Sequence, residues 1–177
     1  RGRFQIRVNR SESASGVLLA QRRGLIADWI QLSQRKSDEG LTLRLVRDKV
    51  IEGKLVDLQG QPVRGATVKI NAIISLVKGP DLSPWIKMMA KRSRGGGLRP
   101  PPAVSPTYGM VKRIAPSSLG LKRTRITDEK GRFQIRGVGR ERLVNLWIQG
   151  DALASTFLTI MTRDQKQKGL SSSTHPA

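Results

Sequence analysis

The sequence contains no cysteine and only one histidine, which limits the chemistry that its side chains can carry out. Without cysteine, the chain forms neither disulfides nor thiolate metal sites. His175 lies in a tail of Ser, Thr and Pro residues, so we expect neither a Ser-His-Asp triad nor a histidine zinc site. No apolar run reaches the roughly 18 residues of a transmembrane helix. We therefore predict a protein that is not an enzyme and that has no catalytic residue, metal or cofactor.

Acidic residues are scarce as well, and the basic excess is concentrated in one stretch. The chain has 33 Lys and Arg against 13 Asp and Glu, a formal net charge of +20, and residues 82–127 contain ten basic residues and no acidic one. Such a charge favours nucleic acid, anionic lipid or another acidic polymer as a partner. The alternative is a solvated basic loop without a specific ligand, and we expect truncation of Lys112 to change stability very little. The candidate polyanion contacts are Lys87, Lys91, Arg92, Arg94, Lys112, Arg113, Lys122 and Arg123.

Aromatic residues make up only 4% of the chain, and its apolar residues, mainly aliphatic, alternate with polar ones in several stretches. Alternation with period two predicts β-strands. Short strands separated by Gly- and Asp-containing turns favour an all-β, antiparallel sandwich over βαβ units. The predicted strands cover residues 51–56, 66–71, 132–136, 143–149 and 155–162.

The turns and one short helix interrupt this pattern. Asp57, Asp128 and Glu129 lie in turns, where a carboxylate can bind calcium but more often accepts hydrogen bonds from its own backbone. Ser83 is suited to cap a helix and Pro84 to its first position, which predicts a helix over 84–92. A Gly- and Pro-rich loop follows it.

The hexapeptide Gly-Arg-Phe-Gln-Ile-Arg occurs at residues 2–7 and again at 131–136, which suggests a repeated structural unit. We expect Phe4 and Phe133 to occupy equivalent inward positions in two similar strands. On this interpretation the chain begins within a domain, with further strands in the stretch 17–33 and at 41–48. The predicted division is 1–48, the carboxy-terminal half of a preceding sandwich; 50–163, a complete sandwich with an insertion at 75–123; and 164–177, a flexible tail.

Two motifs allow a family to be named. The pattern I-x-G-x-L-x-D-x-x-G-x-P-V-x-G-A-x-V at 51–68, followed by T-D-x-x-G-x-F at 127–133, resembles the carboxypeptidase regulatory-like domain. That family is a transthyretin-like, or prealbumin-like, Greek-key β-sandwich. The resemblance implies a non-catalytic module of a large bacterial surface or envelope protein, and thus a cell-envelope or extracellular location. The long insertion between Ile74 and Thr124 departs from the family pattern.

Three functions compete on this basis. The first is a structural or interaction module for spacing, docking or adhesion, whose partners are other domains of the same polypeptide or other proteins. The second is carbohydrate binding, because the resemblance extends to starch-binding-like folds and Trp147 lies on the strand face opposite Leu146 and Ile148, where its ring can stack on a sugar. The third is polyanion or nucleic-acid binding through the basic insertion.

Overall fold

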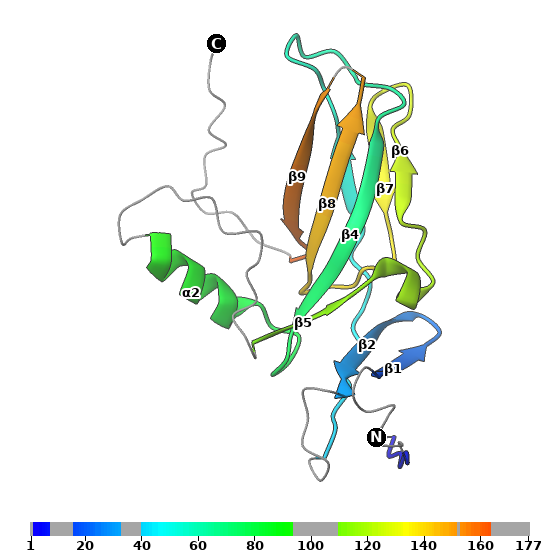
Figure 1. The fold of residues 1–177 in the computed structure, drawn as a ribbon, viewed down its shortest axis with the longest axis vertical. Coiled ribbons are helices and arrows are strands. Elements are labelled where there is room, and N and C mark those ends of the chain that lie inside the picture. Colours follow the sequence, from blue (N-terminus) through cyan, green and yellow to red (C-terminus); the bar gives the residue numbers. More distant parts are fainter. Residues whose placement is uncertain (1, 8–15, 33–39, 94–109, 152, 164–177) are drawn as a thin grey trace.

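The computed structural model describes residues 2–7, 16–32, 40–93, 110–151 and 153–163 (Figure 1). This part of the chain is mostly β, with antiparallel sheets and one α-helix, which confirms the predicted class in its coarse form. The sandwich and its Greek-key topology stay predictions, and the sheets are not closed into a barrel. The elements are β1 Val17–Arg22, β2 Leu25–Gln31, β3 Ile51–Lys54, β4 Thr67–Leu76, α2 Ser83–Ser93, β5 Val111–Ile114, the 3-10 helix η2 Pro116–Leu119, β6 Thr124–Ile126, β7 Arg132–Ile135, β8 Leu143–Gly150 and β9 Leu153–Met161.

The strands form three antiparallel sheets. The largest has five strands, in the order β5-β4-β8-β9, with β6 also pairing with β4. The strands β3 and β7 form a two-stranded sheet, and β1 and β2 form a hairpin. Figure 1 shows β4, β8 and β9 side by side, with the hairpin at the lower end and α2 beside the lower part of the sheet. The strands predicted from period-two alternation are thus present, and β4 continues to Leu76, beyond its predicted end.

The main hydrophobic core lies between the two-stranded β3–β7 sheet and the five-stranded sheet. Along β4 and β8, alternate side chains point to one side of the five-stranded sheet, as the pleat requires. On that side they contact the side chains of β3 and β7. We call the other side of the five-stranded sheet its outer face. The buried members of the core are Trp29, Ile51, Val68, Ile70, Ile73, Ile114, Phe133, Ile135, Val138, Val144, Leu146 and Ile148.

The two copies of the repeated hexapeptide have different environments. Phe133 is 9% exposed and packs over Gly53, where the ring leaves no room for a Cβ atom, whereas Phe4 is 53% exposed. The expected equivalence of the two phenylalanines is therefore wrong. The physical difference is the partner strand, because β7 pairs with β3 along its length, while residues 2–7 are not part of a strand.

The N-terminal segment packs on the rest of the chain. Trp29 of β2 belongs to the main core, and Gly139 lies against Ile26 and Val46, which form an isolated bridge. The carboxylate of Asp48 accepts hydrogen bonds from the backbone N–H groups of Gly137, at 2.8 Å, and Gly139, at 3.2 Å. Within the expected stretch 17–33, β1 and β2 form the strands, but 41–48 contribute only the bridge at Val46. The division at residue 48 stays a prediction about repeats, and it does not separate two cores.

A buried cluster of charges joins the hairpin to the large sheet. Asp28 of β2 accepts a hydrogen bond of 2.5 Å from Lys112 Nζ of β5, and its Oδ1 lies 3.8 Å from Arg142 Nη2. The backbone N–H of Arg44 donates to Asp28 Oδ2 at 2.7 Å. Both cations lie over the ring of Trp29, at 5.4 Å for Lys112 and 4.9 Å for Arg142. Such contacts stabilise a desolvated cation by about 0.5–2 kcal/mol.

Burial and the charge of Asp28 have opposite effects on the pKa of Arg142. Burial lowers the pKa of the Arg142 guanidinium below its ordinary value, and the charge of Asp28 raises it. Arg142 also donates a hydrogen bond to the hydroxyl of Ser75, while its Nε finds no acceptor among the described residues. The cluster is therefore stable only while Asp28 is in place, because removing one member leaves an uncompensated buried charge.

Helix α2 packs on the lower part of the outer face. Its predicted range of 84–92 is confirmed, and the contacts form a second, smaller core of Ala72, Ile74, Leu76, Leu82, Val111 and Leu143, with Trp85, Ile86 and Met110 packed against it. The predicted insertion is thus partly structural, because it supplies α2 and also β5, which pairs with β4.

Charged side chains fix the start of α2. Arg163 donates to Asp81 at 2.6 Å and to Glu141 at 2.9 Å, and the carboxylate of Glu141 accepts from the N–H of Leu82 at 2.8 Å. Hydrogen bonds from Ser83, followed by the charge of Arg163, lower the pKa of Asp81 below 3.8. Because the folded pKa is the lower one, this contribution to stability is present at neutral pH and is lost as the pH falls through the folded pKa.

The cluster gives a prediction that reverses the one made for Lys112. Lys112→Ala should lower the free energy of unfolding by about 3–5 kcal/mol, because Asp28 then loses its closest buried partner. Lys122→Ala is the matched control on an exposed residue of the same basic region, and it should change stability by about 0.5 kcal/mol at most. Chemical denaturation of both variants checks this, and equal small losses would show that the pair does not hold the hairpin.

Candidate functional site

The outer face above α2 presents a row of three side chains from neighbouring strands. Lys69 of β4 pairs with Trp147 of β8, which in turn pairs with Phe157 of β9, so all three side chains lie on one face. The two aromatic rings have centroids 4.9 Å apart at an interplanar angle of 34°. Lys69 Nζ lies 5.9 Å from the centroid of Trp147. The prediction that Trp147 faces away from Leu146 and Ile148 is confirmed, because those two are buried in the main core.

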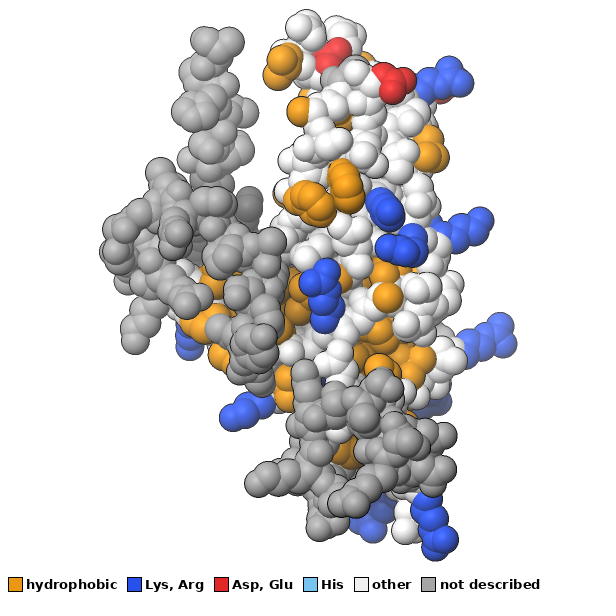
Figure 2. Space-filling view, in the orientation of Figure 1, with side chains coloured by type: hydrophobic (Ala, Val, Ile, Leu, Met, Phe, Trp, Pro, Cys, Tyr) orange, Lys and Arg blue, Asp and Glu red, His pale blue; other side chains and the backbone are white. Residues whose placement is uncertain are grey.

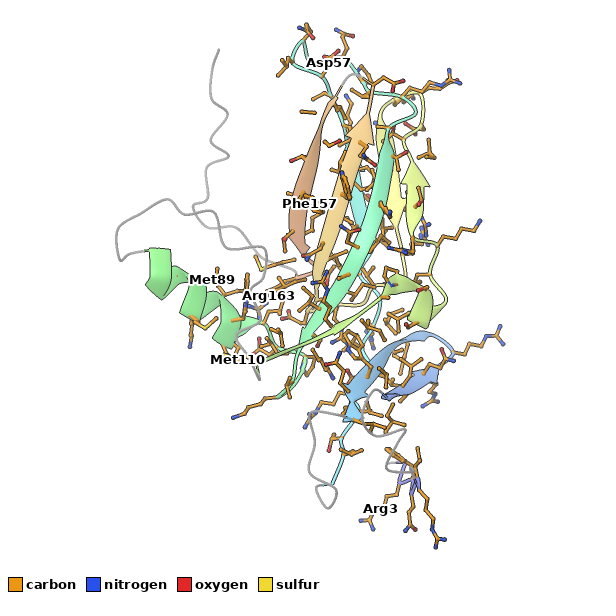
Figure 3. All side chains as sticks on the ribbon, in the orientation of Figure 1. Arg3, Asp57, Met89, Met110, Phe157 and Arg163 are labelled. Carbon is orange, nitrogen blue, oxygen red and sulfur yellow. The ribbon has the colours of Figure 1, made fainter. Side chains whose placement is uncertain are left out.

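Phe157 is the most accessible member of this row, which we call the aromatic row. Its side chain is 66% exposed, and Trp147 beside it is partly exposed. Figure 3 places Phe157 on β9, on the side of the sheet that faces the viewer. Figure 2 shows hydrophobic side chains beside basic ones on the same part of this surface. The row therefore offers an apolar surface next to a cation.

A polar groove lies next to the aromatic row. Thr67 of β4 pairs with Gln149 of β8, and each lies two residues along its strand from a member of the row, on the same face. Gln149 Nε2 lies 3.5 Å from Ser155 Oγ. These side chains line an open groove of about 530 Å³ that can offer hydrogen bonds to a ligand. The groove is lined by Val63, Arg64, Gly65, Thr67, Gln149, Gly150, Asp151 and Ser155.

The predicted polyanion contacts come from separate elements. Lys87 on α2, Arg113 on β5, and Lys122 and Arg123 in the loop before β6 are exposed. Lys112 is a correction: it is only 6% exposed and its ammonium group is bound by Asp28, so it does not face solvent as predicted. The side chains of Lys91, Arg92 and Arg94 lie outside the described part of the chain.

The acidic turn residues Asp57 and Asp128 accept hydrogen bonds from the backbone of their own turns. Asp57 Oδ1 accepts from the N–H groups of Gln59 and Gln61, and Asp128 Oδ1 accepts from those of Lys130 and Arg132. The turn interpretation is confirmed for both residues. Glu129 instead lies 3.5 Å from Arg64 in an exposed ion pair.

The described residues contain no group of three or more His, Cys, Asp or Glu side chains that could hold a metal ion. Among the helices of the described ranges, none has the length and apolar character needed to cross a membrane.

The sequence interpretation singled out Trp147 but not its two neighbours. Period two places Phe157 on one face of β9, and that much was readable from the sequence. Its position opposite Trp147 depends on the register across the turn at Gly150 and Asp151, which contains an irregularity between Ile148 and Gly150. Local patterns do not determine such a register.

The aromatic row predicts a measurable coupling between Trp147 and Phe157. Alanine substitutions made singly and together should show an interaction energy of about 0.5–1.5 kcal/mol, as offset aromatic pairs do. The control cycle combines Trp147→Ala with Leu58→Ala, because Leu58 is fully exposed on a separate turn. Unfolding free energies of the variants check this, and additive losses in both cycles would mean that the rings do not pack together in solution.

Comparisons with protein-family models, with curated proteins and with solved structures found no match for this chain. The resemblance to the carboxypeptidase regulatory-like domain therefore depends on the motifs at 51–68 and 127–133, and it stays a prediction.

Proposed function

We propose that the chain is a non-catalytic interaction module of a larger bacterial protein, with a transthyretin-like sandwich as its scaffold. The observation that carries this proposal is the aromatic row of Lys69, Trp147 and Phe157, in which Phe157 is exposed and the other two side chains are partly exposed. The lower part of that face is covered by α2, whereas Phe157 is exposed above it.

Exposed apolar surface in water is unfavourable. Contiguous exposed apolar groups usually mark a binding or docking surface, because water is excluded when a partner covers them. Phe157 and Met161 are both exposed on the outer face of β9. Aromatic side chains are especially effective in such surfaces, since they bury a large area with few rotatable bonds. The described residues around the row include a lysine and uncharged polar groups, which suit a docking surface.

The leading version of the proposal is docking of a neighbouring domain on this face. Phe157→Cys provides a single thiol in a chain without cysteine, and its rate of alkylation reports whether the position is covered. We expect alkylation to slow by at least about tenfold in the full-length protein relative to the isolated chain, if the neighbour excludes solvent. Leu58→Cys should be labelled equally fast in both. Equal rates for Phe157→Cys in the two contexts would contradict docking on this face.

Carbohydrate binding is a second candidate, and the polar groove favours it. A sugar ring stacked on the aromatic row would place its neighbouring unit toward the groove, where Gln149, Ser155 and Asp151 can exchange hydrogen bonds with hydroxyl groups. Among the described residues nothing comparable supports the polyanion hypothesis, because the predicted contacts that are described come from separate elements and Lys112 is buried.

Titration with soluble glucans tests this second candidate. Trp147→Ala and Phe157→Ala should each weaken binding by at least about fivefold, because each removes a stacking surface, while Leu58→Ala should leave it unchanged. Binding should vary little with salt, since a neutral sugar releases no counterions. The parallel ligand is a labelled oligonucleotide. Tighter binding of the oligonucleotide that falls steeply with salt would instead support the polyanion hypothesis.

A further inference from the structure

The strand β9 has the properties of an edge that is open to another strand. It is nine residues long, and among the described strands it pairs only with β8. Edge strands usually carry charged residues, proline or bulges that prevent pairing with another chain. Between Leu153 and Met161 the sequence has no charged residue and no proline. The protective features are therefore absent from the central part of this edge.

The exposure of β9 on both faces points the same way. Phe157 on the outer face is 66% exposed, and Leu158, whose side chain points to the opposite face, is 45% exposed. Only Leu153 and Ile160 are partly buried against the main core. A strand paired along its free edge would allow neighbouring side chains to cover both of these faces.

We propose that β9 pairs with β9 of a second copy of this chain, antiparallel and with a two-fold axis at Phe157. This interface lies at the edge of the sheet and goes beyond the docking proposed for the outer face. In this register Phe157 faces Phe157 of the other copy, Thr156 faces Leu158, and Ser155 faces Thr159. Each pair combines side chains that are compatible across strands: aromatic with aromatic, apolar with β-branched, and hydroxyl with hydroxyl. The aromatic rows of the two copies then become continuous.

The charge distribution argues for a second copy as the occupant. The chain has a net charge of +20, so two copies repel each other over most of their surfaces, yet neither β8 nor β9 contains any charged residue. An acidic partner would find no basic side chain on these strands to bind. A neutral strand of the same sequence meets no like charge at the point of contact, and it fits its own register.

The net charge also determines how the dimer should respond to salt. Long-range repulsion between basic copies is screened over about 30 Å at 0.01 M salt but over about 8 Å at 0.15 M. Association should therefore strengthen as salt is added. Binding to a polyanion has the opposite salt dependence, so the two processes can be separated experimentally.

Sedimentation velocity of the intact chain at increasing concentration tests the proposal. We expect a monomer–dimer equilibrium at physiological ionic strength, with a dissociation constant that Leu158→Lys raises by at least about tenfold, because two charges are introduced at the two-fold interface. Leu58→Lys adds the same charge on a fully exposed turn and should have little effect. The proposal is overturned if the chain is a monomer at every concentration, at both 0.01 M and 0.15 M salt. It is also overturned if Leu158→Lys leaves the dissociation constant of the dimer unchanged.

Disulfide cross-linking tests the register. Residues directly opposite each other in antiparallel strands have Cα atoms about 4.5–5.5 Å apart, within the range of a disulfide. Oxidation of a mixture of the Ser155→Cys and Thr159→Cys variants should give a covalent heterodimer, whereas each variant alone should give far less. Equal cross-linking in all three samples contradicts the two-fold register. Both substitutions lie on the exposed strand β9. The docking test is independent of this result, because slower thiol labelling at Phe157→Cys in the full-length protein would support outer-face docking even if no dimer formed.

Discussion

The carboxylate of Asp28 is the interaction on which the lower part of the structure depends. It accepts from Lys112 of β5 and from the backbone of Arg44, and it lies close to Arg142 at the start of β8. A buried ion pair adds little stability compared with apolar packing, but its disruption is costly because the remaining charge stays buried. The hairpin β1–β2 therefore has one position in which both cations are compensated. Trp29, next to Asp28, then completes the main core.

This arrangement divides the molecule into a closed and an open end. The hairpin and α2 cover the lower part, where Arg163 and Glu141 hold the start of the helix. Above them, the aromatic row and the strand β9 are left accessible. The proposals for docking and for dimerisation concern different parts of this open end, the sheet face and the sheet edge. A partner on the face leaves the free edge of β9 unpaired, and strand pairing involves Ser155 of the polar groove but not Thr67 or Gln149.

Much of the strand pattern could be predicted from the sequence, because period-two alternation and Asp-containing turns are local signals. The turn roles of Asp57 and Asp128 and the position of α2 were predicted for the same reason. The burial of Lys112 could not be predicted, since its partner Asp28 is 84 residues away and composition does not distinguish a buried lysine from an exposed one. Phe4 shows the converse limit: an identical hexapeptide has a different environment when no strand equivalent to β3 pairs with it.

The buried charge cluster makes the hairpin part of the main core. Residue-resolved hydrogen exchange of the intact chain under native conditions measures this directly, because it gives the free energy of opening for each amide. We expect hydrogen-bonded amides of β2 around Trp29 to open with the same free energy as those of β8, as one cooperative unit. Exchange of the β2 amides through a separate opening of much lower free energy, with β8 still protected, would contradict it.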